Sequence, residues 1–188
     1  MNETIKTILG RRSVRSYSSE QIKDEKLELI LKAGLYAPSA HNQQSWHFTV
    51  IQDKEVIDNL NKASKEEMLK IDDEHLINRA SDESFHLFYN APTVIVVSGE
   101  KSAIAPIIDC SAAIQNMLLA AESVDIGTCW IGLVTPLFKS ERAQEFANLF
   151  GIPDGYELYF AVAAGYKTVE NVQPAPRREN TVNYIRKS

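Results

Sequence analysis

Apolar residues recur at helical spacing in the first part of the chain. Asn2 is of a residue type that caps helices, and a short helix should follow it and end at Gly10 in a left-handed turn. A second stripe at helical spacing predicts a helix through residues 27–35, capped by Asp24 and ended ahead of Pro38. The apolar face of the first helix consists of Ile5, Ile8 and Leu9.

The pattern changes to alternation at residues 46–50, which predicts a strand. Asp53 begins another helical stretch, and a capping box at residues 64–67 predicts that a further helix opens there. Charged residues dominate the segment 65–84. We therefore expect a helical excursion over the core at about 53–90, with 65–84 as its mobile part and as a candidate wall of a substrate pocket.

Residues 93–97 form a continuous β-branched run, which predicts a strand buried on both faces. The helix expected from Pro106 to about Val124 is apolar nearly all round. Such a helix must be covered on more than one side, either by a large core or by another subunit. Gly127 should close this helix ahead of a strand at 128–133.

Ser140 is expected to cap one more helix, and alternation at residues 156–162 predicts the last main strand. The tail at about 166–188 contains a strand-like stretch at 181–185 and should run along the body of its own or a partner chain. Mixed helices and strands, with a hairpin-like last strand, indicate an α+β fold in one domain over residues 1–188. Neither a dinucleotide-binding glycine fingerprint nor a P-loop is present in the sequence.

Composition limits the classes of partner. The formal net charge of -5 and the sequence pI near 5.4 argue against a general nucleic-acid or anionic-membrane surface. Since the sequence shows no leader pattern and no long apolar run, we expect a soluble cytoplasmic protein. Cys110 and Cys129 should be buried reduced thiols, and His75 and His86 show no metal-ligand spacing, so no metal site is expected.

Two stretches carry candidate chemistry. Arg11, Arg12, Ser13 and Arg15 place three guanidinium groups and a hydroxyl within five residues, which can bind a small anion such as a phosphate. The loop at 37–46 is rich in small polar groups that can present donors and acceptors to the edge of a heterocycle. The alternative for this loop is that its polar side chains satisfy their own backbone.

With these stretches collected, the sequence resembles the flavin-dependent nitroreductase family over essentially its whole length. The resemblance rests on Arg11 to Tyr17, on the loop from Ala37 to Trp46, on Gly127 to Gly132, and on Pro176-Arg177. One departure is Ser45, at a position where the family usually has proline between a glutamine and a tryptophan. The resemblance implies a nitroreductase-like mixed or antiparallel central sheet flanked by helices, and an intertwined homodimer with FMN in a groove between the two subunits.

The resemblance also implies roles for individual residues. Arg11, Ser13 and Arg177 would hold the FMN phosphate, with Arg178 as an alternative to Arg177, while Arg12 and Arg15 would face the ribityl chain or the N1 side of the flavin. Backbone groups at Trp130, Ile131 and Gly132 would meet the ring near N5 and O4. The residues expected at the ring edge, from the partner subunit, are Pro38, Ser39 and Ala40, with Asn42 and Gln44 nearby.

On this resemblance, the flavin carries the chemistry and no side chain is catalytic. NADH or NADPH would donate a hydride, and electron-poor acceptors such as nitroaromatics or quinones would accept electrons in a ping-pong mechanism. Two alternatives remain open: a specialised flavoenzyme of the same fold, either flavin-fragmenting or dehalogenating, and a protein that binds FMN without turnover. Thiol catalysis at Cys129 is a third alternative with little support, because no histidine is placed as its base.

Overall fold

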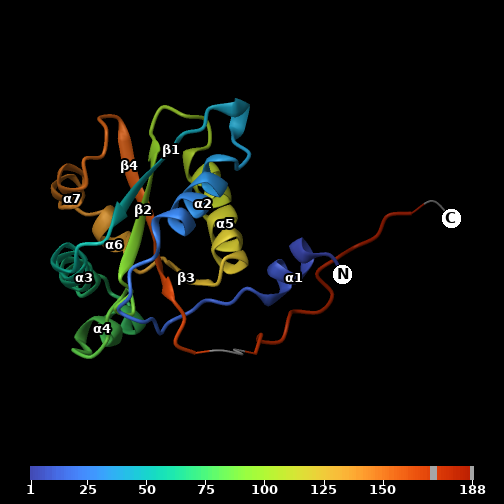
Figure 1. The fold of residues 1–188 in the computed structure, drawn as a ribbon. Helices are drawn as coiled ribbons and strands as arrows, with labels where there is room; N and C mark the ends of the chain where they lie inside the picture. The colour runs from blue at the N-terminus through green and yellow to red at the C-terminus, as the bar shows by residue number, and fades with distance from the viewer. Residues whose placement is uncertain (170–172, 187–188) are drawn as a thin grey trace.

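A four-stranded antiparallel sheet lies at the centre of the computed structural model, which describes residues 1–169 and 173–186. The strands follow the order β1-β2-β4-β3 across the sheet. Figure 1 shows the sheet edge-on between two layers of helices. The strands are β1 (Trp46–Ile51), β2 (Thr93–Glu100), β3 (Ile126–Ile131) and β4 (Tyr156–Tyr166).

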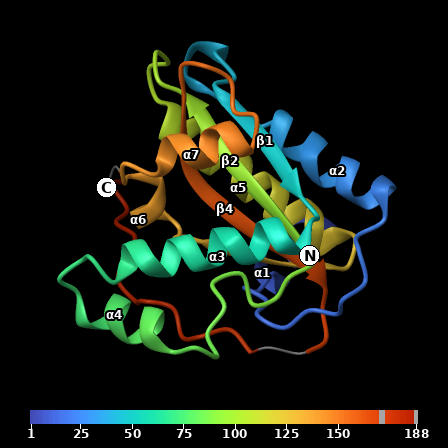
Figure 2. The same cartoon turned by 90° about the vertical axis from the view of Figure 1, so that its left-hand side faces the viewer.

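Helices cover both faces of the sheet. On one face lie α2 (Asp24–Leu35) and α5 (Pro106–Ser123). The other face carries α3 (Lys54–Met68), α4 (Glu74–Ser81), α6 (Thr135–Phe138) and α7 (Ala143–Leu149), which Figure 2 shows in front of the strands. The α+β class with an antiparallel sheet is therefore confirmed.

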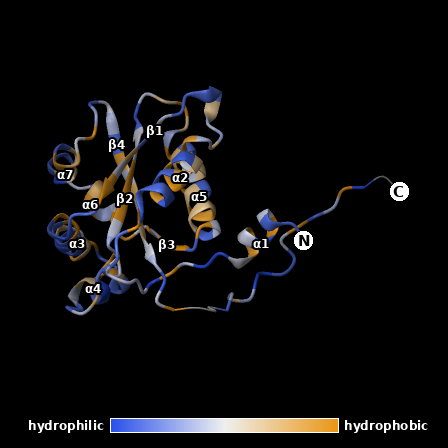
Figure 3. Ribbon diagram, viewed as in Figure 1, coloured by the Kyte–Doolittle hydropathy of each residue, from blue (hydrophilic) through white to orange (hydrophobic). Residues whose placement is uncertain are grey.

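Strand β2 connects the two cores of the molecule. Val94 and Val96 belong to the cluster under α3, α6 and α7, whereas Ile95 and Val97 belong to the cluster under α2 and α5. Alternating side chains point to opposite faces of a sheet, so a continuous β-branched run suits a central strand that is covered on both sides. The prediction for residues 93–97 is confirmed, and Figure 3 shows the apolar residues concentrated in this centre.

The first helix and the tail extend beyond the body, on the same side as each other (Figure 1). Helix α1 (Glu3–Gly10) buries none of its residues, and Leu9 on its apolar face is 58% exposed. Ile107 and Ile108 at the start of α5 are also exposed. None of these exposed side chains belongs to either of the two buried clusters.

Several local predictions were wrong at the ends of elements. Gly10 lies inside α1 with no left-handed conformation, and Asp24 is the first residue of α2, where no side chain caps the helix. Ser64 opens no new helix, because its hydroxyl donates to the carbonyl of Leu60 within an uninterrupted α3. The apolar positions of α3 continue past the capping-box pattern, and tertiary packing outweighs it.

Predictions in the second half of the chain also differ from the structure at the ends of elements. Gly127 lies within β3, and Asp125, with φ of 59°, is the residue that takes the left-handed turn after α5. Ser140 accepts a hydrogen bond from the amide of Arg142, but α7 begins only at Ala143. Residues 181–185 form no strand, and the short α6 was not foreseen from the sequence. None of the helices that the structure describes has the length and apolar character needed to cross a bilayer.

Candidate functional site

The arginine-rich stretch continues from α1 as an extended segment along the outer edge of β3. The amide of Val14 donates to the carbonyl of Thr128 at 2.9 Å, and Ser13 and Thr128 form a parallel bridge. Side chains alternate in extended backbone, so Arg11, Ser13 and Arg15 fall on one side and Arg12 on the other. The predicted anion-binding stretch is therefore divided between two opposite faces.

The first face surrounds the thiol of Cys129. Burial raises the pKa of Cys129, while Arg15, a hydrogen bond with Ser13, and Arg11 act in the opposite direction. The three groups that lower this pKa are the same three that alternation places on one side of the segment bonded to β3. Because burial is the largest influence, the group remains a thiol near neutral pH, which argues against its use as a nucleophile.

Arg15 is oriented by Tyr89, a residue that the sequence did not single out. The guanidinium carbon lies 5.8 Å from the centre of the Tyr89 ring, and a side-chain hydrogen bond with Tyr89 raises the pKa of Arg15. Tyr89 and Asn90 both have positive φ, in a turn where Nδ1 of His86 accepts hydrogen bonds from the amides of Phe88 and Asn90. His86 thus has a structural role that its sequence context did not indicate.

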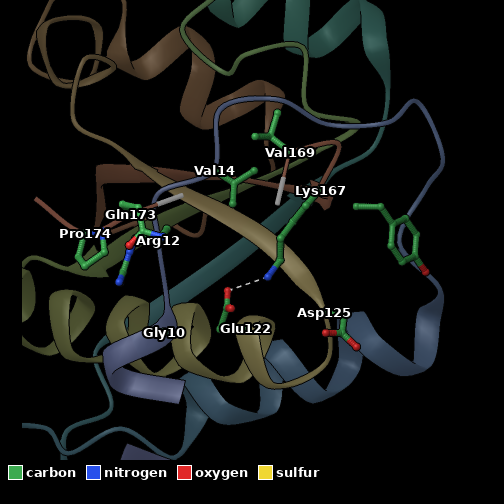
Figure 4. Close-up of a pocket in the computed structure, with 10 residues that line it drawn as sticks. Gly10, Arg12, Val14, Glu122, Asp125, Lys167, Val169, Gln173 and Pro174 are labelled. Atoms are coloured by element: carbon green, nitrogen blue, oxygen red, sulfur yellow. Dashed lines mark hydrogen bonds and ion pairs between the residues drawn. The ribbon is translucent and has the colours of Figure 1, made fainter. Parts of the chain in front are cut away.

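Arg12 lies in a different environment, shown in Figure 4. Its guanidinium donates to the carbonyl of Leu9 at 2.9 Å and to that of Arg11 at 2.6 Å. It lines a cavity of about 560 Å³ in which Lys167 pairs with Glu122 at 3.0 Å. The structure therefore does not bring Arg12 together with Arg11, Ser13 and Arg15.

The end of β3 offers accessible backbone beside this first face. Because Thr128 directs its carbonyl to Val14 and away from β4, alternation directs the backbone groups of Trp130 toward the same open edge. The indole of Trp130 packs edge-on against Phe160, and Ile131 is buried. Nothing lies within 4 Å of the place that a Cβ on Gly132 would take, so a flat molecule can approach the backbone there.

The loop between α2 and β1 is held in an unusual conformation. His41, Asn42 and Gln44 all have φ between 51° and 55°, in the left-handed region. The hydroxyl of Ser39 accepts from the amide of Gln44, and the Gln44 side chain donates to Asn42. The alternative that the polar side chains of the loop satisfy their own backbone thus holds for Ser39, and Pro38 and Ala40 lie in the same loop.

The sheet register separates this loop from the arginine stretch. Ser13 bridges to Thr128 in β3, and Thr128 lies level with Thr93 of β2 because both pair with Ala164 of β4. The loop ends at Trp46 in β1, which pairs with Gly99 of β2. The six steps along β2 from Thr93 to Gly99 correspond to about 20 Å. Within one chain, the two predicted parts of the site therefore lie toward opposite ends of the sheet.

Arg177 and Arg178 belong to the exposed tail. Figure 1 shows this tail leaving the body of the molecule beyond α1. Among the contacts that the structure describes, none joins either arginine to Arg11 or Ser13. The expected convergence of both chain ends on one phosphate is not found within this chain.

Comparison with known proteins gives the wider context of this geometry. The model of the family described as "Nitroreductase family" matches residues 8–166. The chain belongs to the nitroreductase family. A relative from Archaeoglobus fulgidus, provisionally named NADH dehydrogenase/NAD(P)H nitroreductase, is 37% identical over 172 residues, covering 88% of this chain and 86% of the relative.

Two further proteins match nearly the whole of this chain. The NADPH-flavin oxidoreductase of Vibrio harveyi is 29% identical over 177 residues, which cover 94% of this chain and 70% of that protein. The crystal structure of a Bacteroides fragilis nitroreductase with bound FMN matches with a TM-score of 0.91 at 35% identity, covering 99% of this chain and all of that one. The family resemblance seen in the sequence is confirmed.

Proposed function

We propose that this protein is an FMN-dependent oxidoreductase that takes a hydride from NADH or NADPH and reduces electron-poor acceptors. The observation that carries the proposal is the alternation that places Arg11, Ser13 and Arg15 on one side of a segment bonded to β3, with uncrowded backbone at Gly132 just after that strand. A phosphate with two negative charges and a planar ring system require these two features side by side. Family membership and the FMN held by the Bacteroides fragilis relative support the choice of cofactor.

The chemical character of these groups fits the cofactor. Arg11 and Arg15 supply fixed positive charge and Ser13 a hydroxyl donor, which together suit a phosphate and the adjoining polar chain. Backbone groups of Trp130, on the edge of β3, and of Gly132, which follows the strand, suit the polar rim of a flavin. When bound, FMN supplies the redox chemistry, accepting a hydride at N5 and passing two electrons to an acceptor.

We propose that a second copy of the chain completes the site. The loop with Ser39, Asn42 and Gln44 leads into β1, at the opposite edge of the sheet from β3 and its ring-facing backbone, so a partner subunit would bring its own loop to the ring edge. The exposed apolar residues of α1 and of the start of α5 support such an assembly. The tail at 166–188, with Arg177 or Arg178, would then reach across to the partner from a single domain of residues 1–188.

The groups of this chain would position and shield the reactants. NAD(P)H and the acceptor would use the same open face in turn, which gives ping-pong kinetics, and the helical excursion at 65–84 would form part of the wall around them. Nitroaromatics, quinones and free flavins are the acceptor classes to test. Free flavins join this set because the Vibrio harveyi relative is named a flavin oxidoreductase.

The experiment measures NAD(P)H oxidation by the purified protein reconstituted with FMN, in one series with oxygen and in another without it. We expect oxidation of NADH or NADPH that depends on a nitrofuran or a quinone, with parallel lines in double-reciprocal plots. Full occupancy with FMN but no turnover of any acceptor would favour the specialised flavoenzyme of the same fold. Bound flavin that NAD(P)H does not bleach would favour a binding protein without turnover.

A further inference from the structure

A buried carboxylate lies beneath the loop between α2 and β1. Asp109 in the first turn of α5 is only 3% exposed, yet no cation pairs with it among the described contacts. Its Oδ1 accepts from the amide of Ala40 at 2.9 Å, and its Oδ2 accepts from the hydroxyl of Ser45, also at 2.9 Å. The N-terminal end of a helix favours negative charge, which explains how this carboxylate is accommodated.

These two hydrogen bonds hold the two ends of the strained segment. His41, Asn42 and Gln44, the residues with left-handed φ, all lie between Ala40 and Ser45. Non-glycine residues adopt that conformation only where their surroundings enforce it. Ser45 is itself fully buried, and its carbonyl accepts from the amide of Glu100, so the loop end is attached to both α5 and β2.

We propose that Asp109 is a positioning residue for cofactor binding, acting through Ala40 and Ser45 to hold the loop 39–44 in the conformation that contacts the flavin ring. This inference rests on the proposed function, because the loop is assigned to the ring edge only there. Ser45 is the partner through which Asp109 holds the C-terminal end of the loop, because the Ser45 hydroxyl donates to the Asp109 carboxylate. Asp109 contacts no reactant and is not catalytic.

Substitutions at Asp109 and Ser45 remove different numbers of these hydrogen bonds. In Asp109→Asn the remaining oxygen can accept from Ala40, and the new amide can donate to the Ser45 hydroxyl, so both contacts can persist. Asp109→Ala removes both and leaves the partly buried amide of Ala40 without its acceptor. Ser45→Ala removes only one contact. Ser64→Ala is the matched control, since Ser64 is also fully buried and its hydroxyl donates to Leu60 in α3.

The test combines FMN titration of the apoprotein, the visible circular dichroism of bound flavin, and amide hydrogen exchange of residues 39–45 without cofactor. We expect Ser45→Ala to weaken FMN binding about tenfold and to speed loop exchange, with Ser64→Ala within twofold of wild type. Asp109→Asn should lie near wild type, and Asp109→Ala should lose at least as much affinity as Ser45→Ala. Adding Ser45→Ala to Asp109→Ala should cost little more, because the pair acts as one unit.

The outcomes separate the two proposals. Wild-type protein that binds no FMN would overturn the proposed function and this inference together. Wild-type protein that binds FMN, with Ser45→Ala matching Ser64→Ala in affinity, flavin spectrum and loop exchange, would overturn this inference alone. If Asp109→Ala fails to fold, the comparison of Ser45→Ala, Asp109→Asn and Ser64→Ala still decides the question.

Discussion

Gly127 and Val14 are packed so closely that a Cβ on Gly127 would stand 2.9 Å from Cγ1 of Val14. Lys167 closes the other side, with its Cγ at 2.8 Å from the same position. Val14 lies between Ser13 and Arg15 in the segment bonded to β3. Because Gly127 has no side chain, the segment that carries Arg11, Ser13 and Arg15 can lie close to the edge of β3.

The first prediction follows from this contact. Gly127→Ala should push Val14 outward, lower the free energy of unfolding by about 1 to 3 kcal/mol through overpacking, and weaken FMN binding. Urea unfolding and FMN titration measure the two effects. Gly10→Ala is the control, since nothing lies within 4 Å of its Cβ position in α1, and it should stabilise by about 0.5 to 1 kcal/mol. Unchanged FMN affinity in Gly127→Ala would show that the contact between Gly127 and Val14 does not position the cofactor-binding residues.

The second prediction compares neighbouring arginines. Arg11→Ala should weaken FMN binding by about 2 to 5 kcal/mol, because it removes one partner of a charge-assisted pair. Arg12→Ala should cost clearly less, since the Arg12 guanidinium bonds to the carbonyls of Leu9 and Arg11 on the opposite face. The two variants are compared by their flavin content after dialysis and by calorimetric titration with FMN. Equal losses would mean that Arg12 also contacts the cofactor, as the family resemblance implied.

The third prediction concerns the orientation of Arg15. Tyr89→Phe keeps the ring beside the guanidinium but removes the hydrogen bond that fixes it. We expect FMN binding to weaken by about 1 kcal/mol, roughly fivefold, with little change in stability. Tyr156→Phe, at the far end of β4, serves as the control. Wild-type affinity in Tyr89→Phe would show that Arg15 does not depend on this bond.

The fourth prediction is a pH dependence of stability. Burial lowers the pKa of His86, against the opposing influence of Asp58, whereas unfolded histidine titrates near pH 6.5. Below about pH 6.5 the unfolded chain therefore binds a proton that the folded chain resists, and stability falls as the pH decreases through this window. The pKa of Asp58 is lowered chiefly by its hydrogen bond from Lys54, so its own contribution is lost at more acidic pH.

His86→Asn is the variant that tests this prediction. Its side-chain oxygen can replace Nδ1 as the acceptor for the amides of Phe88 and Asn90, but it does not titrate. Urea unfolding from pH 5 to 8 should show a flatter profile in His86→Asn than in wild type. His75→Asn, at an exposed position in α4, should retain the wild-type slope. The same slope in His86→Asn would assign the effect to other groups.

The sequence predicted those features that depend on local pattern. The continuous β-branched run at residues 93–97 became the central strand β2, and the long apolar segment after Pro106 became α5, because uninterrupted apolar sequence indicates an element covered on more than one side. The alternation of the arginine stretch could have been anticipated only by recognising that it is extended. A strand-like pairing of Ser13 with Thr128, far away in sequence, imposes that conformation.

The features that the sequence did not indicate are contacts between distant residues. Asp109 meets Ala40 across 69 positions and Ser45 across 64, and Tyr89 meets Arg15 through a turn that His86 stabilises. Each of these residues is ordinary in its local context. Their roles arise only when tertiary structure brings them to the loop or to the arginine face.

The most direct test is the visible absorption spectrum of the purified, FMN-reconstituted and dialysed protein, recorded anaerobically before and after one equivalent of NADH or NADPH. The account predicts a retained yellow chromophore at one flavin per chain that is bleached by the nucleotide and restored by a quinone. A protein that stays colourless after reconstitution, or a bound flavin that neither nucleotide bleaches, would contradict it.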